Sequence, residues 1–251
     1  MNKKIWITGA SSGIGKALAI KFATEGWQVA ASARRDNLLL ELNKNNPNIH
    51  SFPLDVVKAE TTKNVFQSIL KKLGEIDLCI FSTGTYEPKL EKEINEKQIR
   101  TVMEVNFFGV VNCIKAVENY FKEKKNGHIS IVSSVAGYRG LPNSTGYGAS
   151  KAALNNLTES LYFDFKKYNV RISLISPGFI KTPMSDKNQF KMPFIKSAEF
   201  AANKIFKGLT KSKAFEISFP KELTMIMKIL RVLPYWKYLY LIEKLTKLQK
   251  R

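Results

Sequence analysis

A tyrosine and a lysine stand four positions apart in the segment Tyr147-Gly-Ala-Ser-Lys151. Residues at this spacing share one face of a helix. A tyrosine titrates at roughly pH 10 in water, and a neighbouring ammonium favours the phenolate and lowers that pKa. We therefore expect Tyr147 to exchange a proton with a developing alkoxide, with Lys151 lowering the pKa of its phenol. The pattern is common on helices, where it also arises from a surface lysine beside a core tyrosine.

Two further polar groups belong to the same chemistry. Ser134 follows a buried apolar run and precedes Tyr147, and its neutral hydroxyl can hydrogen-bond a carbonyl oxygen and stabilise the charge that develops on it. We assign this role to Ser134 rather than to the adjacent Ser133. Asn106, in Val105-Asn106-Phe-Phe-Gly109, is unremarkable as a mid-helix asparagine and gains interest only beside the other three.

A glycine-rich loop, Thr8-Gly9-Ala-Ser-Ser-Gly13-Ile-Gly15, joins the first apolar run to a helical pattern. Such a loop exposes backbone N–H groups and the positive end of a helix dipole, which suits a pyrophosphate. Gly9 allows the turn, Gly13 lets phosphates approach the backbone, and Gly15 lets the helix pack on the sheet. The cofactor-binding residues expected here are Gly9, Ser11, Ser12, Gly13, Ile14 and Gly15.

The glycine spacing, together with Ser134, Tyr147 and Lys151, resembles the short-chain dehydrogenase/reductase family over about residues 3–220. The resemblance implies a nicotinamide-dependent oxidoreductase that interconverts a carbonyl and an alcohol by moving a hydride and a proton. It also implies that Lys151 holds the nicotinamide ribose, that Asn106 holds a water linking Lys151 to solvent, and that Ser133 ends a strand near the cofactor.

The same resemblance assigns further cofactor contacts. Asp55 matches the position that meets the adenine amino group, although it could equally be the N-cap of the next helix. Gly84 ends the segment Phe81-Ser-Thr-Gly84, which departs from the family's usual Asn-Asn-Ala-Gly but keeps the glycine. The turn expected to receive the nicotinamide contains Pro177, Gly178, Ile180 and Thr182.

The end of the second strand indicates which nicotinamide cofactor is used. It reads Ala33-Arg34-Arg35, with no carboxylate until Asp36. An acidic residue there would bind a ribose 2′-hydroxyl, whereas a guanidinium can bind a 2′-phosphate through two charge-assisted bonds. We therefore expect NADP(H) in preference to NAD(H). In the alternative, the two arginines only begin the next helix in solvent.

Short apolar runs alternate with helical patterns along the whole chain, which predicts an α/β fold with a doubly wound, mostly parallel seven-stranded Rossmann sheet and helices on both faces. Residues 1–220 form the dinucleotide-binding and catalytic domain, and 221–251 a basic, apolar helical C-terminal extension. The expected strands are 3–7, 28–32, 49–54, 78–81, 128–133, 170–175 and 214–218, and the expected helices include 15–25, 61–72, 98–124, 147–167 and 198–210.

Composition and charge limit which partners, metal sites and cellular location we expect. The chain has 251 residues and a formal net charge of +19, which fits a solvated basic surface, a phosphorylated cofactor or anionic lipid. No nucleic-acid-binding motif accompanies the charge, so we expect no nucleic acid partner. His50 and His128 lack partners at ligand spacing, so no metal is expected, and the two cysteines should be buried free thiols. No apolar run is long enough for a signal peptide or a spanning helix, which favours the cytoplasm.

Substrate and partners follow from two apolar segments. The loop 184–197, helped by 135–143, should select a hydrophobic or lipid-like ketone or aldehyde, because Phe190, Met192, Pro193, Phe194 and Ile195 make it apolar. The tail 221–251 either packs on the core or a subunit interface, or rests as a peripheral contact on anionic membrane. The resemblance implies a homodimer or homotetramer. A cofactor-sensing protein with this fold and no turnover remains an alternative.

Overall fold

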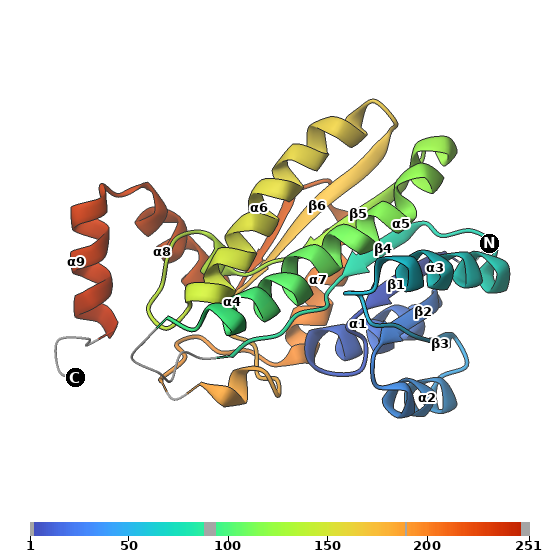
Figure 1. The fold of residues 1–251 in the computed structure, drawn as a ribbon, viewed down its shortest axis with the longest axis horizontal. Coiled ribbons are helices and arrows are strands. Elements are labelled where there is room, and N and C mark those ends of the chain that lie inside the picture. Colours follow the sequence, from blue (N-terminus) through green and yellow to red (C-terminus); the bar gives the residue numbers. More distant parts are fainter. Residues whose placement is uncertain (1–2, 88–93, 189, 247–251) are drawn as a thin grey trace.

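The computed structural model describes residues 3–87, 94–188 and 190–246, and within them seven strands form one sheet (Figure 1). The strands follow the spatial order β3-β2-β1-β4-β5-β6-β7, and all six neighbouring pairs run parallel. The order reverses between β1 and β4, and ligands of such sheets bind outside the carboxyl ends of the strands at that point. The doubly wound α/β fold expected from the sequence is confirmed.

The elements of the described chain have the following bounds. The strands are β1 (Lys4–Thr8), β2 (Gln28–Ala33), β3 (Ile49–Pro53), β4 (Leu78–Phe81), β5 (Gly127–Val132), β6 (Val170–Pro177) and β7 (Glu216–Phe219). The helices are α1 (Gly13–Thr24), α2 (Asp36–Asn45), α3 (Ala59–Leu73), α4 (Glu96–Met103), α5 (Gly109–Lys124), α6 (Thr145–Lys166), α7 (Ala198–Lys211), α8 (Lys221–Val232) and α9 (Tyr235–Thr246). Short helical turns are η1 (Glu104–Phe108), η2 (Val135–Gly137) and η3 (Ser185–Lys187).

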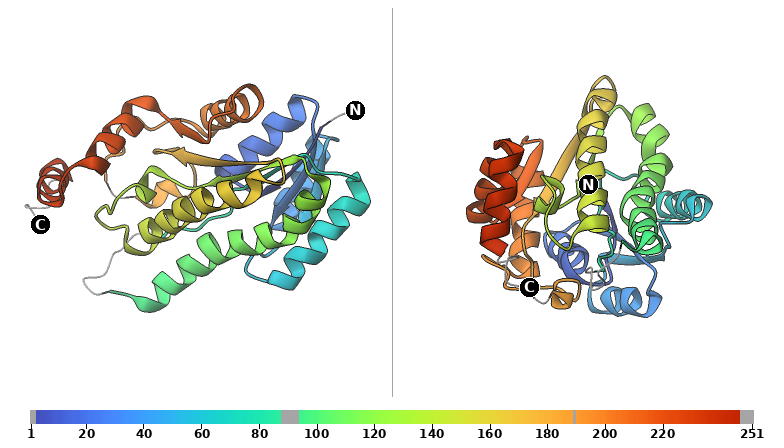
Figure 2. Two further views of the ribbon diagram at one scale, coloured as in Figure 1. Left: turned by 90° about the horizontal axis from the view of Figure 1, so that it is seen from above. Right: turned by 60° about the vertical axis from the view of Figure 1, so that its left-hand side comes forward.

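Helices cover both faces of the sheet (Figure 2). Side chains alternate along β1, so that Ile5 and Ile7 face α1, α2 and α7, whereas Trp6 faces α3, α5 and α6. Both faces are apolar because both are covered, which is why the strands read as continuous hydrophobic runs. Cys79 and Cys113 lie buried in the second layer as free thiols, as expected.

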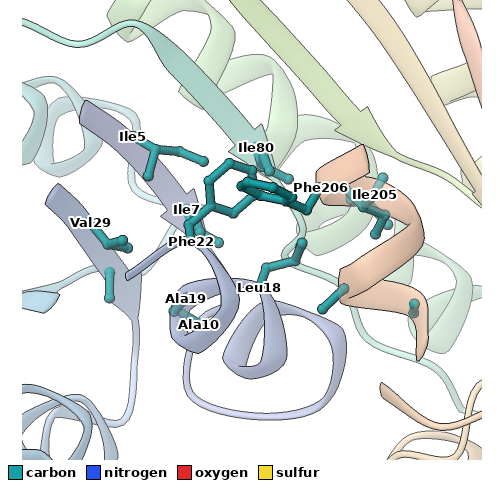
Figure 3. Close-up of a cluster of buried hydrophobic side chains, with 14 of the residues drawn as sticks. Ile5, Ile7, Ala10, Leu18, Ala19, Phe22, Val29, Ile80, Ile205 and Phe206 are labelled. Atoms are coloured by element: carbon teal, nitrogen blue, oxygen red, sulfur yellow. The ribbon is translucent and has the colours of Figure 1, made fainter. Parts of the chain in front are cut away.

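The packing of α1 on the sheet fixes the glycine loop that precedes it. Leu18, Ala19 and Phe22 of α1 lie against Ile205 and Phe206 of α7 in one buried cluster (Figure 3). The rings of Phe22 and Phe206 meet edge to face at 5.0 Å between centroids. Burial of one such ring stabilises the fold by roughly 1.5–3 kcal/mol, so the amino end of α1 is held firmly at the edge of the sheet.

The helix expected over residues 98–124 is interrupted, and this expectation was wrong in one respect. Between α4 and α5 the chain makes the π-helical turn η1, which contains Asn106. A π turn accommodates an extra residue and often occurs at functional sites. Asn106 becomes fully buried there, and its amide is satisfied by tertiary hydrogen bonds that no local pattern reveals. The other expected bounds agree within two residues.

The carboxyl-terminal helices α8 and α9 pack one face on the core. Leu223, Met227, Leu230, Tyr238 and Ile242 form a separate apolar cluster with residues of the segment that follows β5. In Figure 1, α9 lies at the end of the long axis opposite the amino terminus. Within the described ranges of the chain, no helix is both long and apolar enough to cross a membrane.

Candidate active site

The four predicted catalytic residues converge at the carboxyl edge of the sheet. Tyr147 and Lys151 lie one turn apart on α6, and the Lys151 ammonium is 5.7 Å from the centroid of the Tyr147 ring. Ser134 follows β5 and lies close enough to the Tyr147 phenol to lower its pKa. A Cβ added at Gly84, just beyond β4, would lie 3.5 Å from the Asn106 Oδ1 atom and 3.7 Å from the Lys151 Nζ atom. The residues expected to act together therefore lie together.

The two adjacent serines have different surroundings. The Ser133 hydroxyl donates to the Lys151 carbonyl oxygen at 3.0 Å and so ties the strand end to α6. The Ser134 hydroxyl accepts from the Ala136 N–H at 3.1 Å and lies beside the phenol of Tyr147. Of the two serines, Ser134 is the one that lies beside the Tyr147 phenol, which supports its assignment over Ser133.

Burial dominates the pKa of both Tyr147 and Lys151. Burial raises the pKa of Tyr147 above its ordinary value, a hydrogen bond from Ser134 opposes the rise, and Tyr86 adds to it. Burial also lowers the pKa of Lys151 to about 8. Burial, the largest cause for each group, therefore sets both directions, and the lowering of the phenol pKa by the ammonium stays a prediction. Lys151 donates to the Val132 carbonyl oxygen at 2.9 Å.

Asn106 connects the site to the loop after β4. Its Oδ1 atom accepts from the Thr85 N–H at 2.6 Å, and its Nδ2 atom donates to the Thr85 carbonyl at 2.9 Å and to the Ser150 hydroxyl at 3.0 Å. Ser150 in turn donates to the Tyr147 carbonyl at 2.7 Å. Asn106 thereby fixes the distance between the Gly84 loop and the catalytic helix.

The glycine loop has the geometry that a dinucleotide requires. Gly9 and Gly13 adopt φ of +71° and +54°, a region that other residues rarely enter. A Cβ at Gly15 would lie 2.2 Å from the Gly9 carbonyl oxygen, so only glycine permits the tight turn. Ser12 is the N-cap of α1 but makes no side-chain cap bond, which leaves the first N–H groups of the helix without a side-chain acceptor. These residues, with Ser11 and Ile14 in the same loop, fit a pyrophosphate.

Arg35 extends over this loop. Its guanidinium donates to the Ser11 hydroxyl at 2.8 Å and to the Ser12 hydroxyl at 2.8 Å, and both Arg34 and Arg35 are exposed. The second helix begins at Asp36, immediately after them. Asp55 accepts from the Val57 N–H at 3.3 Å in a turn and is not the N-cap of α3, whose cap is Lys58.

The expected nicotinamide turn lies across from the glycine loop. A Cβ at Gly13 would be 3.1 Å from the Thr182 methyl carbon, so the two segments approach closely. Ile180 is buried and pairs with Lys196 in an isolated bridge. Pro177 ends β6, and the Gly178 N–H donates to the Phe219 carbonyl at 2.7 Å. These contacts hold the turn against β7.

After β4 the chain reads Phe81-Ser-Thr-Gly84 in place of the family's usual Asn-Asn-Ala-Gly, and Thr8 stabilises this segment. Its hydroxyl accepts from the N–H groups of Ser82 and Thr83 at 3.2 and 3.4 Å, which joins β1 to the segment where the family usually carries asparagines. A Cβ at Gly9 would meet the Ser82 carbonyl oxygen at 2.9 Å. Close packing of two backbones thus replaces the missing amides.

Sequence reasoning missed Tyr86. Its buried ring meets the Tyr147 ring edge to face at 5.1 Å between centroids. The Tyr86 carbonyl accepts from the Lys187 ammonium at 3.2 Å, and Lys187 also pairs with Glu87 at 2.6 Å. The only sequence signal was an aromatic residue two positions after Gly84, which has no pattern of its own.

The expected substrate loop lies beside the same site. The Met184 methyl carbon is 3.9 Å from the position of a Cβ at Gly84. Phe190, Phe194 and Ile195 are 45%, 45% and 40% exposed, and Phe190 meets Phe179 edge to face. The loop therefore begins beside the Gly84 segment and exposes apolar side chains further along.

The model of the short chain dehydrogenase family matches residues 3–193. Together, fold and relatives define an oxidoreductase that acts on CH–OH and C=O groups with a nicotinamide cofactor. The chain belongs to the short-chain dehydrogenase/reductase family.

Several relatives illustrate the range of that family. An uncharacterised oxidoreductase of Myxococcus xanthus is 34% identical over 91% of this chain and 91% of its own length. A 3-oxoacyl-(acyl-carrier-protein) reductase of Thermotoga maritima is 35% identical over 72% of this chain and 75% of its own. A glucose 1-dehydrogenase of Gluconobacter oxydans is 32% identical over 75% of each chain.

Solved structures agree with the fold. A short-chain dehydrogenase of Burkholderia cenocepacia in complex with NADP has a TM-score of 0.80 at 25% identity, covering 92% of this chain and 93% of its own. A family member of Burkholderia phymatum in complex with NAD has a TM-score of 0.83 at 22% identity, covering 90% and 92%. The shared fold serves both cofactors, so the choice between them depends on individual residues.

Proposed function

We propose that the protein is an NADP(H)-dependent oxidoreductase that interconverts a carbonyl and an alcohol on a hydrophobic or lipid-like substrate. Tyr147 is the general acid and base, and Ser134 binds the reacting oxygen. Lys151 holds the cofactor and stabilises the phenolate by its charge, and Asn106 positions α6. The observation that carries the proposal is the meeting of Tyr147, Ser134 and Lys151 beside Gly84, at the edge of the sheet where the glycine loop also ends.

The mechanism follows from the protonation state of these groups. The bound dinucleotide supplies the hydride in reduction and accepts it in oxidation. In reduction, Ser134 hydrogen-bonds the carbonyl oxygen, and the Tyr147 hydroxyl gives its proton to that oxygen as negative charge develops. The raised pKa of Tyr147 keeps the phenol protonated at neutral pH, which suits this direction. Lys151 remains mostly charged below about pH 8 and supports the phenolate that is left.

The central test is the variant Tyr147→Phe, which removes the transferable proton and keeps the ring. We expect turnover of a carbonyl substrate to fall by about a thousandfold or more, with NADPH affinity nearly unchanged, because general acid catalysis contributes roughly 10²–10⁴ and alignment is lost as well. Tyr162→Phe, an exposed tyrosine on the same helix, is the matched control. Unaltered turnover in Tyr147→Phe would refute the assignment.

The proposed NADP(H) preference rests on Arg35. Its guanidinium lies over Ser11 and Ser12, where a 2′-phosphate on the adenine ribose would approach the loop. We expect Arg35→Ser to weaken NADPH binding by about tenfold or more and to leave NADH binding nearly constant, because a charge-assisted bidentate contact is lost. Arg34→Ser, measured in parallel by fluorescence titration, separates the two neighbouring arginines. Tighter binding of NADH than NADPH by the unmodified protein would overturn the preference.

The proposed substrate class rests on the exposed apolar loop that begins at Met184, beside the Gly84 segment. The names of the relatives point to both an acyl thioester and a sugar, and the loop favours the former. NADPH consumption against ketones and aldehydes of increasing chain length tests this. Turnover confined to small polar carbonyls contradicts the apolar substrate, and tight NADPH binding without turnover anywhere favours a cofactor-sensing protein.

A further inference from the structure

The two carboxyl-terminal helices carry an exposed apolar face that the proposed function does not use. Their inward residues pack on the core, whereas Met225, Ile229 and Val232 of α8 are 61%, 60% and 80% exposed. They stand three or four positions apart, so they form a single outward stripe. Trp236 and Leu239 of α9 extend the exposed set at 68% and 59%.

The exposed side chains of α8 and α9, together called the tail face, combine three chemical features. Aliphatic side chains occupy α8, and the aromatic residues Tyr235, Trp236 and Tyr240 occupy α9. Exposed cations lie among them, at Lys221, Arg231, Lys237 and Lys244. Tryptophan and tyrosine favour the boundary between water and hydrocarbon, and lysine and arginine favour anionic headgroups.

The charge of residues 221–251 favours an anionic surface over a second copy of the chain as the binding partner. Residues 221–251 contain eight lysines and arginines against two glutamates, although Lys247, Lys250 and Arg251 lie outside the described residues. The whole chain carries a formal charge of +19. Two copies of such a segment repel each other, which disfavours burial of the tail face between subunits, whereas an anionic surface attracts it.

The tail face also has a fixed relation to the active site. Arg139 donates to the carbonyl oxygens of Leu230, Arg231 and Leu233 at 3.0, 3.2 and 2.6 Å, and its guanidinium carbon lies 4.2 Å from the centroid of the Tyr238 ring. These contacts clamp the end of α8 to the segment that follows Ser134. A surface bound to the outside of α8 would therefore be linked through Arg139 to the segment that follows Ser134.

We propose that the tail face docks peripherally on an anionic lipid bilayer, with its apolar stripe at the headgroup boundary and its cations among the headgroups. The attraction needs no spanning segment, because amphipathic helices bind through buried apolar area and charge together. It stands independently of turnover, since binding to vesicles can be measured on the protein without substrate.

Co-sedimentation of the full chain with vesicles tests the charge component. We expect binding to vesicles of phosphatidylcholine with phosphatidylglycerol, little binding to phosphatidylcholine alone, and weaker binding at high salt. Lys237→Glu with Lys244→Glu should reduce the partition coefficient by roughly thirtyfold. The matched control is Lys63→Glu with Lys71→Glu, which changes the net charge equally on α3. Equal loss in both pairs, or no binding by the full chain, overturns the proposal.

A second pair of variants tests the apolar component. Val232→Ser with Trp236→Ser should reduce binding by roughly tenfold, because both side chains are exposed in the folded chain and buried on docking. Leu40→Ser with Phe163→Ser removes comparably exposed apolar groups elsewhere and should bind as before. Light scattering of the same variants distinguishes the other occupant. A lower oligomer mass with undiminished vesicle binding would make the tail face a contact between copies of the chain and overturn the proposal.

Discussion

Lys151 lies in surroundings very different from those of a lysine in water. Its side chain is 4% exposed, and burial lowers its pKa to about 8. The group is mostly charged below that pH and increasingly neutral above it. Since a dinucleotide brings two phosphate charges and a ribose to this edge of the sheet, the charged form favours cofactor binding.

The affinity for NADPH should therefore depend on pH above neutrality. Between pH 7 and pH 9 we expect the dissociation constant to rise by up to about tenfold, because one pKa unit corresponds to a tenfold change in protonation. Lys151→Gln should bind more weakly at pH 7 and show little change over the same interval. Fluorescence titration at both pH values measures this, and parallel slopes in the two proteins would contradict the role of Lys151.

At the scale of the element, His128 makes the pairing of β5 with β6 sensitive to acid. The ring is 9% exposed and its Nε2 atom lies 2.9 Å from the Ser173 hydroxyl oxygen. Burial first, and then the nearby Arg171, lower the pKa of His128 to about 3. Between that value and about 6.5, the unfolded chain binds a proton that the folded chain excludes, so this contribution to stability is lost as the pH falls.

The unfolding free energy measured at different pH values should show the contribution of His128. From pH 7 to pH 5 the unmodified protein should lose about 2 kcal/mol more unfolding free energy than His128→Gln, which keeps a polar partner for Ser173 but does not titrate. Denaturant unfolding at each pH provides the comparison. His50→Gln serves as the comparison: His50 is less buried and its pKa is also lowered, first by burial, so this variant should remove a smaller part of the loss. Equal losses in the wild-type protein and His128→Gln would exclude His128 as the source.

The elements also show what the sequence could and could not predict. The strands and the Gly9–Gly15 loop were predictable, since apolar runs and glycine spacing are local patterns. The π turn at Asn106 was not, because Thr85 and Ser150 satisfy its amide across the fold. Tyr86 depends in the same way on a neighbour far along the chain. The raised pKa of Tyr147 depends on burial, which spacing alone does not reveal.

At the scale of the whole molecule, Arg139 adds polar contacts to the apolar cluster that joins α8 and α9 to the rest of the chain. Arg139 donates to the last carbonyls of α8, and its guanidinium carbon lies 4.4 and 4.2 Å from the centroids of the Tyr235 and Tyr238 rings. Cations at the carboxyl end of a helix are favourable. The division of the chain at residue 220 and the expected dimer or tetramer both remain predictions.

Removal of the Arg139 contacts should destabilise α8 and α9 locally without unfolding the rest of the chain. In Arg139→Ala we expect amide hydrogen exchange over α8 and α9 to become roughly tenfold faster, because the free energy of local opening falls. Exchange in β1 to β5 should stay constant. Arg100→Ala, which removes an exposed arginine paired with Glu96, is the control. Unchanged exchange in Arg139→Ala would show that the apolar cluster alone holds the helices.

The space beside Gly178 is filled by a side chain from beyond residue 220. A Cβ at Gly178 would lie 2.6 Å from the Leu223 Cδ2 atom, so α8 forms the back wall of the turn expected to hold the nicotinamide. Proteolytic cleavage after Pro220 would therefore leave a cavity beside the turn expected to hold the nicotinamide, and we expect the cleaved protein to have altered activity. If a preparation loses turnover on storage, intact-mass measurement should look first for loss of this wall.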